Sequence, residues 1–486
     1  MTFARPGEKG GGGGIDKTAQ VRYHNGQGRG KGVENMGKPN VLLVNCDDMG
    51  YGDLGCYGSR ANRTPVIDRL AAEGLRFTSF YAASPVCSPS RAGLLTGCYP
   101  PRVGIHAVLF PGDAEGLNPS EYTLGQMFRD AGYRTMIVGK WHLGDQEGSL
   151  PLRFGFDEYY GLPYSNDMGV QKGKTDFVRY PPLPLLRGDE VVEEQPDQRS
   201  LTERYVEQCV SFMRGAKGRP FFLYLAHMHV HLPLYAQDRF VQASLNGDYG
   251  ACVEEVDWAM EALMAQIRAQ GIEQDTLVIF TSDNGSRGDH GASNAPLRGG
   301  KFTAWEGGVR VPCVMYWPGH IPAGQVNPNM AANVDLLPTL SALAGGRRPG
   351  KDIDGVDISA MLTDEAAAPR ENMIYFAPYG QGSQLCAVRE GKWKLHLHRD
   401  GKAVRELYDL EKDVGEAENV YGEHPDVAER LKELYRLYSR RLGDTAEGIK
   451  AEEARPCRVE AHPRTLTVYD PNHPYMVAMY DKDDAG

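Results

Sequence analysis

Short apolar runs alternate with helical segments from residue 41 onward, and no other feature of the sequence constrains the fold as strongly. Residues 41–44, 221–226 and 276–281 are apolar runs with the length of buried strands. Segments with helical periodicity separate such runs, as between residues 250 and 269, where apolar side chains recur every three or four positions. Strands joined by helices of this length form a parallel or mostly parallel sheet that is covered on both faces. We therefore predict an α/β protein built on one large, mostly parallel sheet flanked by helices.

Shorter signals predict the remaining elements of this domain. Thr64 followed by Pro65 indicates a helix that has Thr64 as its N-cap, Pro65 in the first helical position and an end near residue 75. We expect further helices at residues 123–131, 201–214 and 334–344, and further strands at 134–138 and 309–316.

The pattern changes after about residue 370, where short alternating segments are separated by glycines and charged residues. They predict a smaller antiparallel sheet with a helix near residues 425–441 packed on it, the four segments being 373–376, 385–388, 393–398 and 406–410. We accordingly divide the chain into a Gly-rich tail (1–37), a large α/β domain (38–370) and a C-terminal α+β subdomain (371–486). Within the last of these, residues 445–486 show no pattern that places them.

The first 37 residues contain a run of five glycines at 10–14 and four more glycines interleaved with basic residues. Such a composition buries too little apolar surface to offset the entropy of ordering the chain. We therefore predict a disordered tail, with a basic anchor as the alternative. Met36 is a candidate for the natural start, because the residues after it lead directly into the first predicted strand.

The charge balance limits the partners of the protein. Lys and Arg number 53 against 64 Asp and Glu, a formal net charge of −11, so the surface as a whole should attract neither nucleic acid nor an anionic membrane. No run reaches the ~18 apolar residues that span a bilayer, and residues 1–37 lack the apolar core of a secretory signal. Nine cysteines without a CxxC pair do not form the spacing of a disulfide framework or a zinc ribbon. We expect a cytoplasmic protein.

Polar side chains follow four of the predicted strands. They are Asp47 and Asp48, Lys140 to His142, the three histidines at 227, 229 and 231, and Asp283 with Asn284. Each group alone is also typical of a turn or a helix cap, but in open α/β sheets ligands bind beyond the carboxyl ends of the strands. Three carboxylates and an amide oxygen favour a hard divalent cation, Ca²⁺ or Mg²⁺, over zinc. The sequence thus predicts a metal site at this edge of the sheet.

Cys87 opens the string C-S-P-S-R, which an apolar segment follows. We expect Cys87 at a helix N-terminus, where free N–H groups and the helix dipole favour an anion. Arg91 lies one helical turn further on and can reach Cys87 or its ligand. A buried structural cysteine before a helix is the alternative.

Together these motifs resemble the type I sulfatases, which share the alkaline-phosphatase-like fold, and in particular the arylsulfatase A and N-acetylgalactosamine-6-sulfatase branch. The resemblance extends from about residue 40 to residue 420. It rests on C-x-P-S-R with LLTG at residues 94–97 and on the strings at 47–54, 139–144, 282–285 and 300–310. A C-terminal string at 407–410 with Asp413 and Glu416 is similar to the second subdomain of that family.

The resemblance implies a set of catalytic groups. Cys87 would be oxidised to Cα-formylglycine, whose hydrate attacks the sulfur of the substrate and later expels sulfate. Asp47, Asp48, Asp283 and Asn284, together with the modified Cys87, would hold one divalent metal, with Ca²⁺ favoured over Mg²⁺. Arg91 and Lys140 would stabilise the ionised diol, and His142 would act as the base in the elimination. His231 and Lys301 would bind sulfate and protonate the leaving oxygen.

The function expected from this resemblance is hydrolysis of sulfate monoesters, from the chain ends of sulfated carbohydrates and from aryl sulfates. A phosphonate or phosphate ester hydrolase of the same fold is the alternative, whereas a non-catalytic sulfate-binding protein would require the loss of a central group. The protein would need a formylglycine-generating or anaerobic sulfatase-maturating enzyme, and its oligomeric state stays open. We predict that the side chains that contact the substrate are His106, Asn166, His229, His290 and Arg298. The alternative is that these positions carry solvent-exposed loop side chains without a function. His229 equally fits a structural role.

Overall fold

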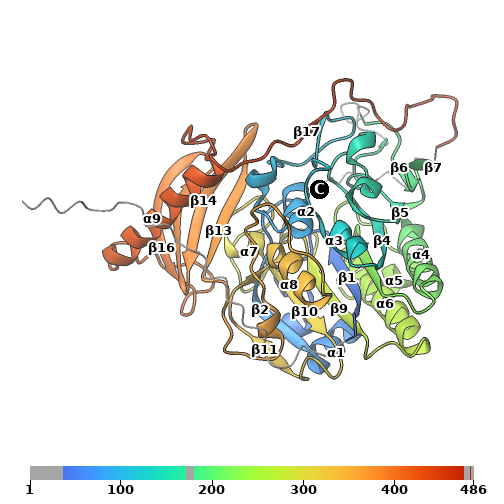
Figure 1. The fold of residues 1–486 in the computed structure, drawn as a ribbon, viewed down its shortest axis with the longest axis horizontal. Helices are drawn as coiled ribbons and strands as arrows, with labels where there is room; N and C mark the ends of the chain where they lie inside the picture. The colour runs from blue at the N-terminus through green and yellow to red at the C-terminus, as the bar shows by residue number, and fades with distance from the viewer. Residues whose placement is uncertain (1–36, 171–179, 476–481, 483–486) are drawn as a thin grey trace, which may run out of the picture. The chain divides into compact units, whose positions relative to one another are not determined.

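The computed structural model describes residues 37–170, 180–475 and 482. The predicted disordered tail and Met36 lie outside the described residues. An eleven-stranded sheet forms the core, in the order β11-β2-β10-β9-β1-β8-β4-β5-β6-β7, and β12 pairs with β2 (Figure 1). Its strands are β1 (Asn40–Cys46), β2 (Leu75–Tyr81), β4 (Arg134–Gly139), β5 (Glu158–Gly161), β6 (Pro184–Arg187), β7 (Glu190–Glu194), β8 (Phe221–Ala226), β9 (Thr276–Ser282), β10 (Arg310–Tyr316), β11 (Gln325–Asn327) and β12 (Ala331–Ala332).

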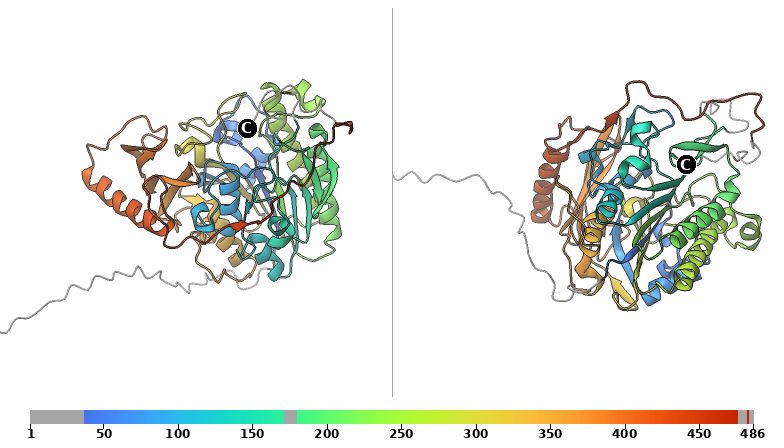
Figure 2. Two further views of the ribbon diagram at one scale, coloured as in Figure 1. Left: turned by 90° about the horizontal axis from the view of Figure 1, so that it is seen from above. Right: turned by 45° about the vertical axis from the view of Figure 1, so that its right-hand side comes forward.

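The centre of the sheet is parallel, as predicted, and every residue of β1, β8 and β9 is buried. Strand β1 pairs in parallel with β8 and β9, and β8 pairs in parallel with β4. Helices cover both faces of the sheet (Figure 2), and this explains why the strands are apolar throughout instead of alternating. The helices are α1 (Pro65–Glu73), α2 (Cys87–Thr96), α3 (Leu124–Asp130), α4 (Leu201–Gly215), α5 (Asp238–Ala243), α6 (Gly247–Ala269), α7 (Glu306–Val309) and α8 (Leu336–Leu343).

Both flanks of the large sheet contain antiparallel pairs, one flank being β5-β6-β7. Strand β10, predicted as one more strand of the sheet, is antiparallel to both β9 and β2. Strand β2 was not predicted, because the predicted helix extended to residue 75. In the structure this helix ends at Glu73 and β2 begins at Leu75. Gly74 packs against the backbone of β10, where a Cβ atom would lie 2.4 Å from the carbonyl oxygen of Met315, and the chain turns into β2 immediately after it.

Helix α1 begins at the predicted cap, but a distant residue supplies the capping hydrogen bonds. Thr64 occupies the N-cap position and Pro65 the first turn, but the Thr64 side chain makes no capping hydrogen bond. Its hydroxyl instead donates to Asp68 and accepts from the Gly55 N–H. The carboxylate of Asp257, on helix α6, accepts from the N–H groups of Val66 and Ile67, so a distant residue satisfies the free donors of the helix.

The small antiparallel sheet is present as predicted, in the order β13 (Asn372–Tyr379), β14 (Gly382–Glu390), β15 (Trp393–Arg399) and β16 (Lys402–Asp409). Helix α9 (Pro425–Leu442) packs on it through an apolar face that includes Val427 and Leu431. After α9 the chain returns to the large domain, where β17 (Arg458–Val459) pairs with β3 (Glu115–Gly116) (Figure 1).

The structure also bears on the cysteines and on the apolarity of the helices. All nine cysteines lie among them and all are free thiols. The helices of this part of the chain include none with the length and apolarity that crossing a bilayer requires.

Candidate active site

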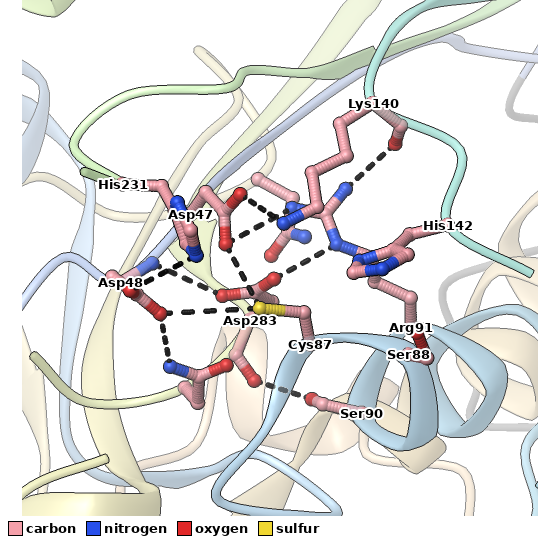
Figure 3. A network of polar contacts seen from close by, with 12 residues as sticks. Asp47, Asp48, Cys87, Ser88, Ser90, Arg91, Lys140, His142, His231 and Asp283 are labelled. Atoms are coloured by element: carbon pink, nitrogen blue, oxygen red, sulfur yellow. Dashed lines mark hydrogen bonds and ion pairs between the residues drawn. The ribbon is translucent and has the colours of Figure 1, made fainter. Parts of the chain in front are cut away.

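The polar groups predicted at four strand ends converge at one edge of the sheet. Asp47 follows β1, Lys140 follows β4, the histidine segment follows β8, and Asp283 follows β9. These strands are neighbours in the order β9-β1-β8-β4 and run in the same direction. Their carboxyl ends therefore place the side chains side by side, as Figure 3 shows.

Cys87 is the first residue of helix α2, with Val86 as the N-cap, which confirms the predicted position at a helix start. Its Sγ lies 3.2 Å from Oδ1 of Asp47 and 4.0 Å from Oδ1 of Asp48. The side chain is almost completely buried. Helix α2 thus points its N-terminus at the carboxylates that follow β1 (Figure 3).

The acidic side chains form a cluster that fits a cation. Ligand atoms of Asp47, Asp48, Cys87 and His231 all lie within 4.8 Å of one another. Asn284 donates from Nδ2 to Asp48 at 2.7 Å, while its Oδ1 is buried and has no hydrogen-bond partner. An unpaired buried amide oxygen beside carboxylates is the arrangement expected of a ligand whose ion is to be bound. The donor set therefore fits a hard divalent cation.

Three basic side chains surround the same point. Arg91 donates from Nε to Asp283 at 2.8 Å, and Lys140 forms an ion pair with Asp47. Lys301 reaches the cluster from the other side, with Nζ 2.8 Å from Oδ2 of Asp48. All three side chains are buried. A low-dielectric site with fixed positive groups is suited to holding and polarising an oxyanion.

The electrostatics of the carboxylates follow from this packing. Burial by itself would raise the pKa of Asp47, but the charges of Lys140, His231 and Arg91 hold it well below its ordinary value. For Asp283, burial and the neighbouring charge of Asp47 raise the pKa to about 7. Burial and Asp47 also raise the pKa of the Cys87 thiol. The surroundings therefore do not favour a reactive thiolate at this position.

Two histidines face the cluster. Burial and the charge of Lys140 lower the pKa of His142, whose Nε2 lies 2.9 Å from the carbonyl oxygen of Leu109 and whose Nδ1 has no partner. The Nε2 of His231 lies 3.8 Å from Asp48, and burial and Lys301 lower its pKa. The neutral form of His142 is therefore favoured, and this ring can accept a proton.

The candidate substrate contacts lie in different surroundings. His290 is partly exposed and lines a hollow beside Asp48 together with Arg287. The exposed Arg298 stacks over Trp305, with its carbon Cζ 3.9 Å from the ring centre. His106 is half-buried and lies 3.0 Å from the hydroxyl of Ser383 on β14.

Asn166 and His229 are turned into the protein. Asn166 donates to Gln198 and to the carbonyl of Pro233. His229 is fully buried with its Nε2 3.2 Å from Glu255. Burial lowers the pKa of His229, but Cys252 and Glu255 outweigh this and raise it to about 10. This packing favours the structural role for His229.

Two further residues belong to the site and were not predicted. Ser165 accepts from Lys140 at 3.1 Å and lies 3.3 Å from Nδ1 of His231, so it links two predicted groups. Ser90, within the C-S-P-S-R string, donates to the backbone carbonyl of Asp283. Ser90 could have been predicted as a site residue because it lies within the C-S-P-S-R motif, whereas Ser165 lies in a loop that carries no sequence motif.

The family model described as sulfatase matches residues 39–346, and the model for the C-terminal part of N-sulphoglucosamine sulphohydrolase matches residues 300–441. Arylsulfatase A of Homo sapiens is 40% identical over 443 residues, covering 82% of this chain and 87% of the relative. N-acetylgalactosamine-6-sulfatase of Rattus norvegicus is 40% identical over 383 residues, covering 74% and 71%.

Among solved structures, that of Ps i-CgsB in complex with k-i-k-neocarrahexaose superimposes with a TM-score of 0.74 at 30% identity. The alignment covers 86% of this chain and 95% of the other.

Proposed function

The chain belongs to the sulfatase family and is a sulfuric ester hydrolase, and on this premise we propose that it releases sulfate from sulfated sugars through a formylglycine made from Cys87. The observation that carries the proposal is the position of Cys87, buried at the start of α2 with its sulfur beside two carboxylates. An unmodified thiol is poorly activated there, whereas a modified side chain at the same point would meet both the cation site and the basic groups.

The proposed cofactors are one Ca²⁺ and the formylglycine. Asp47, Asp48, Asp283 and Asn284 would hold the cation, and the free Oδ1 of Asn284 supports this assignment. When bound, the cation supplies Lewis-acid polarisation of a sulfate oxygen, and the aldehyde hydrate supplies the nucleophile.

The basic side chains of the protein have separate proposed tasks. Lys301, which pairs with Asp48, would bind a sulfate oxygen and neutralise charge on the ester oxygen as the S–O bond breaks. Arg91 and Lys140 are anchored by Asp283 and Asp47, so their positive charges are fixed before substrate arrives. His231 would protonate the leaving alcohol, and Ser165 orients its ring. His142, neutral and with an unpaired Nδ1, would accept the proton in the second half of the reaction.

We propose a sulfated carbohydrate, cleaved at a chain end, as the substrate. A relative named as an N-acetylgalactosamine-6-sulfatase and a structural neighbour in complex with k-i-k-neocarrahexaose support the sugar. Arg287, Asp289 and His290 lie beside Asp48, and their polar groups are suited to sugar hydroxyls. The formal net charge of −11 disfavours long anionic polymers over small or terminal groups.

A substrate panel tests this proposal. Purified protein is assayed for sulfate release from sulfated monosaccharides, from oligosaccharides sulfated at the chain end or internally, and from aryl sulfate, with aryl phosphonate as the competing class. We expect the highest kcat/KM on chain-end sugar sulfates and no activity in the Cys87→Ala variant. High activity on aryl sulfate with equal low activity on all sugars would overturn the substrate assignment. A higher kcat/KM on phosphonate would favour the alternative hydrolase.

A further inference from the structure

A cavity of about 540 Å³ lies where the large sheet meets the small one. Its wall includes Thr78 and Ser79 of β2, Arg310 at the start of β10, and Arg389 and Gly391 at the end of β14. None of the described residues that line it belongs to the site around Cys87. The cavity is therefore separate from the proposed active site.

Three buried guanidinium groups line this cavity, and that of Arg370 is already paired with Asp335. Arg310 and Arg389 are 8% and 7% exposed. Arg310 donates hydrogen bonds from Nε to the carbonyl of Thr78 at 2.6 Å and from Nη1 to the carboxylate of Glu306 at 3.3 Å. Arg389 donates hydrogen bonds from Nε to the carbonyl of Gly391 and from Nη1 to the hydroxyl of Tyr81. Among the described residues, Nη2 of Arg389 meets no hydrogen-bond acceptor, whereas the Arg310 guanidinium also contacts Tyr51, with Cζ 5.6 Å from its ring centre.

The charges behind this wall do not balance. Arg310, Arg389 and Lys394 are positive, and the buried carboxylates that face them are Glu306 and Glu416. The neighbouring ring of His396 adds no charge, because burial lowers its pKa. Three cations against two carboxylates leave one buried positive charge, which is costly in a low-dielectric interior unless an anion compensates it.

The carboxylates at the mouth of the cavity do not provide this compensation. Glu371 and Glu411 line the cavity and are exposed. Neither is within ion-pair distance of Arg310 or Arg389, whose nearest carboxylate among the described residues is that of Glu306. Lys392 also lines the cavity and is paired with Asp409. The excess charge therefore remains directed into the cavity.

We propose that this cavity is a second anion-binding site, in which Arg310 and Arg389 hold a tetrahedral oxyanion such as sulfate, free or carried on a sugar. Guanidinium groups match the oxygens of such an anion because their planar N–H donors can bind two oxygens at once. Thr78 and Ser79 line the same cavity. The volume leaves room for a sugar ring beside the oxyanion. The inference does not depend on the proposed chemistry at Cys87.

Gly391 provides a matched pair of variants for the test. It lines the cavity with φ of +55°, and a Cβ atom built on it would meet nothing within 4 Å. Asn and Asp tolerate this conformation better than other residues. Gly391→Asp therefore adds a negative charge at the cavity, and Gly391→Asn adds the same volume and backbone strain without charge.

Equilibrium dialysis with radiolabelled sulfate counts the anions bound by each protein. We expect Gly391→Asp to bind one sulfate fewer per chain than Gly391→Asn, which should match the wild type. Arg389→Gln should weaken the same site at least tenfold, and if this variant does not fold, the Gly391 pair still decides. Equal binding by the two Gly391 variants would overturn the proposal.

Competition by a sulfated monosaccharide then identifies the source of the anion. Displacement at lower concentration than unlabelled sulfate assigns the site to a sugar sulfate, and weaker displacement assigns it to free sulfate. A failed sulfatase assay with intact second-site binding would reject the proposed function alone. Normal sulfatase activity with equal binding by both Gly391 variants would reject this site alone.

Discussion

The sulfur of Cys87 lies 3.2 Å from Oδ1 of Asp47, although the two residues come from different elements, a helix N-terminus and the end of a central strand. This relationship places the proposed nucleophile at the cation site. It also brings it next to Lys140, which pairs with the other oxygen of Asp47.

Removing the divalent cation should lower both activity and stability. Bound cation stabilises the folded protein by RT ln(1 + [L]/Kd), about 2.7 kcal/mol at one hundred times Kd. We expect chelation to lower Tm and added Ca²⁺ to restore it. Asn284→Ala removes the free Oδ1 and should require more Ca²⁺ for the same Tm. A Tm that is independent of Ca²⁺ in the chelated wild type would refute this.

Lys301→Ala should reduce kcat/KM by about 10²–10³, the range found when one charge-stabilising donor is removed from an active site. Its Nζ lies against Asp48 and would face the ester oxygen. Lys432→Ala, on the outer helix α9, is the control because Lys432 pairs with the exposed Glu429 and lies over the ring of Tyr421. Initial-rate kinetics measure both. Equal rates for the two variants would remove Lys301 from the mechanism.

Glu255 and Glu254 are adjacent on α6 and should differ sharply in their effect on stability. Glu255 pairs with the buried His229. The carbonyl of His229 accepts a hydrogen bond from the N–H of Asp47, and the N–H of Val230 donates to the carbonyl of Asp47. Glu254 pairs with Arg63, whose side chain is 51% exposed. Glu255→Ala should cost about 3–5 kcal/mol and Glu254→Ala below about 1 kcal/mol.

Urea unfolding measures these two costs, and calcium titration of the folded variants reports whether Asp47 has moved. Similar costs for the two variants would show that the His229–Glu255 pair does not support the site.

Glu306 should make stability depend on pH in the acid range. Burial alone would raise the pKa of Glu306, but Lys394, Arg389 and Arg310 hold it well below its ordinary value of 4.5. A carboxylate with a depressed pKa contributes stability above the unfolded pKa and loses it as pH falls. The destabilisation by Glu306→Gln should therefore be largest near neutral pH and shrink below about pH 4.5.

The exposed Glu433 on α9 offers the control for this prediction, because Glu433→Gln should leave the pH dependence unchanged. Chemical unfolding of both variants from pH 3 to pH 7 gives the comparison. A destabilisation by Glu306→Gln that stays constant over this range would contradict the role assigned to its charge.

Residues of the site that follow apolar strands could be predicted from the sequence. Asp47, Lys140 and Asp283 stand directly after buried runs, and the parallel sheet brings such ends together whatever the loops do. Cys87 could be predicted because a motif marks it. These positions depend on local pattern and on one rule of sheet topology.

Partners that meet over long sequence separations could not be predicted. Ser165 has no local signal, and it joins the site because its loop follows β5. Asp257 replaces Thr64 as the effective cap of α1 from 191 residues away. The charges that meet Glu306 come from β10, β14 and β15. Such contacts are determined by packing between elements, which periodicity and turn signals do not encode.

The claim that Cys87 is converted to formylglycine is tested by the mass of the peptide that contains this residue, taken from active protein. The claim predicts a fraction in which the CH₂SH side chain has become CHO, and it predicts that kcat per chain rises in proportion to this fraction across preparations. Co-expression with a formylglycine-generating enzyme provides the range of fractions. Fully active protein with only the unmodified thiol at Cys87 would contradict the claim.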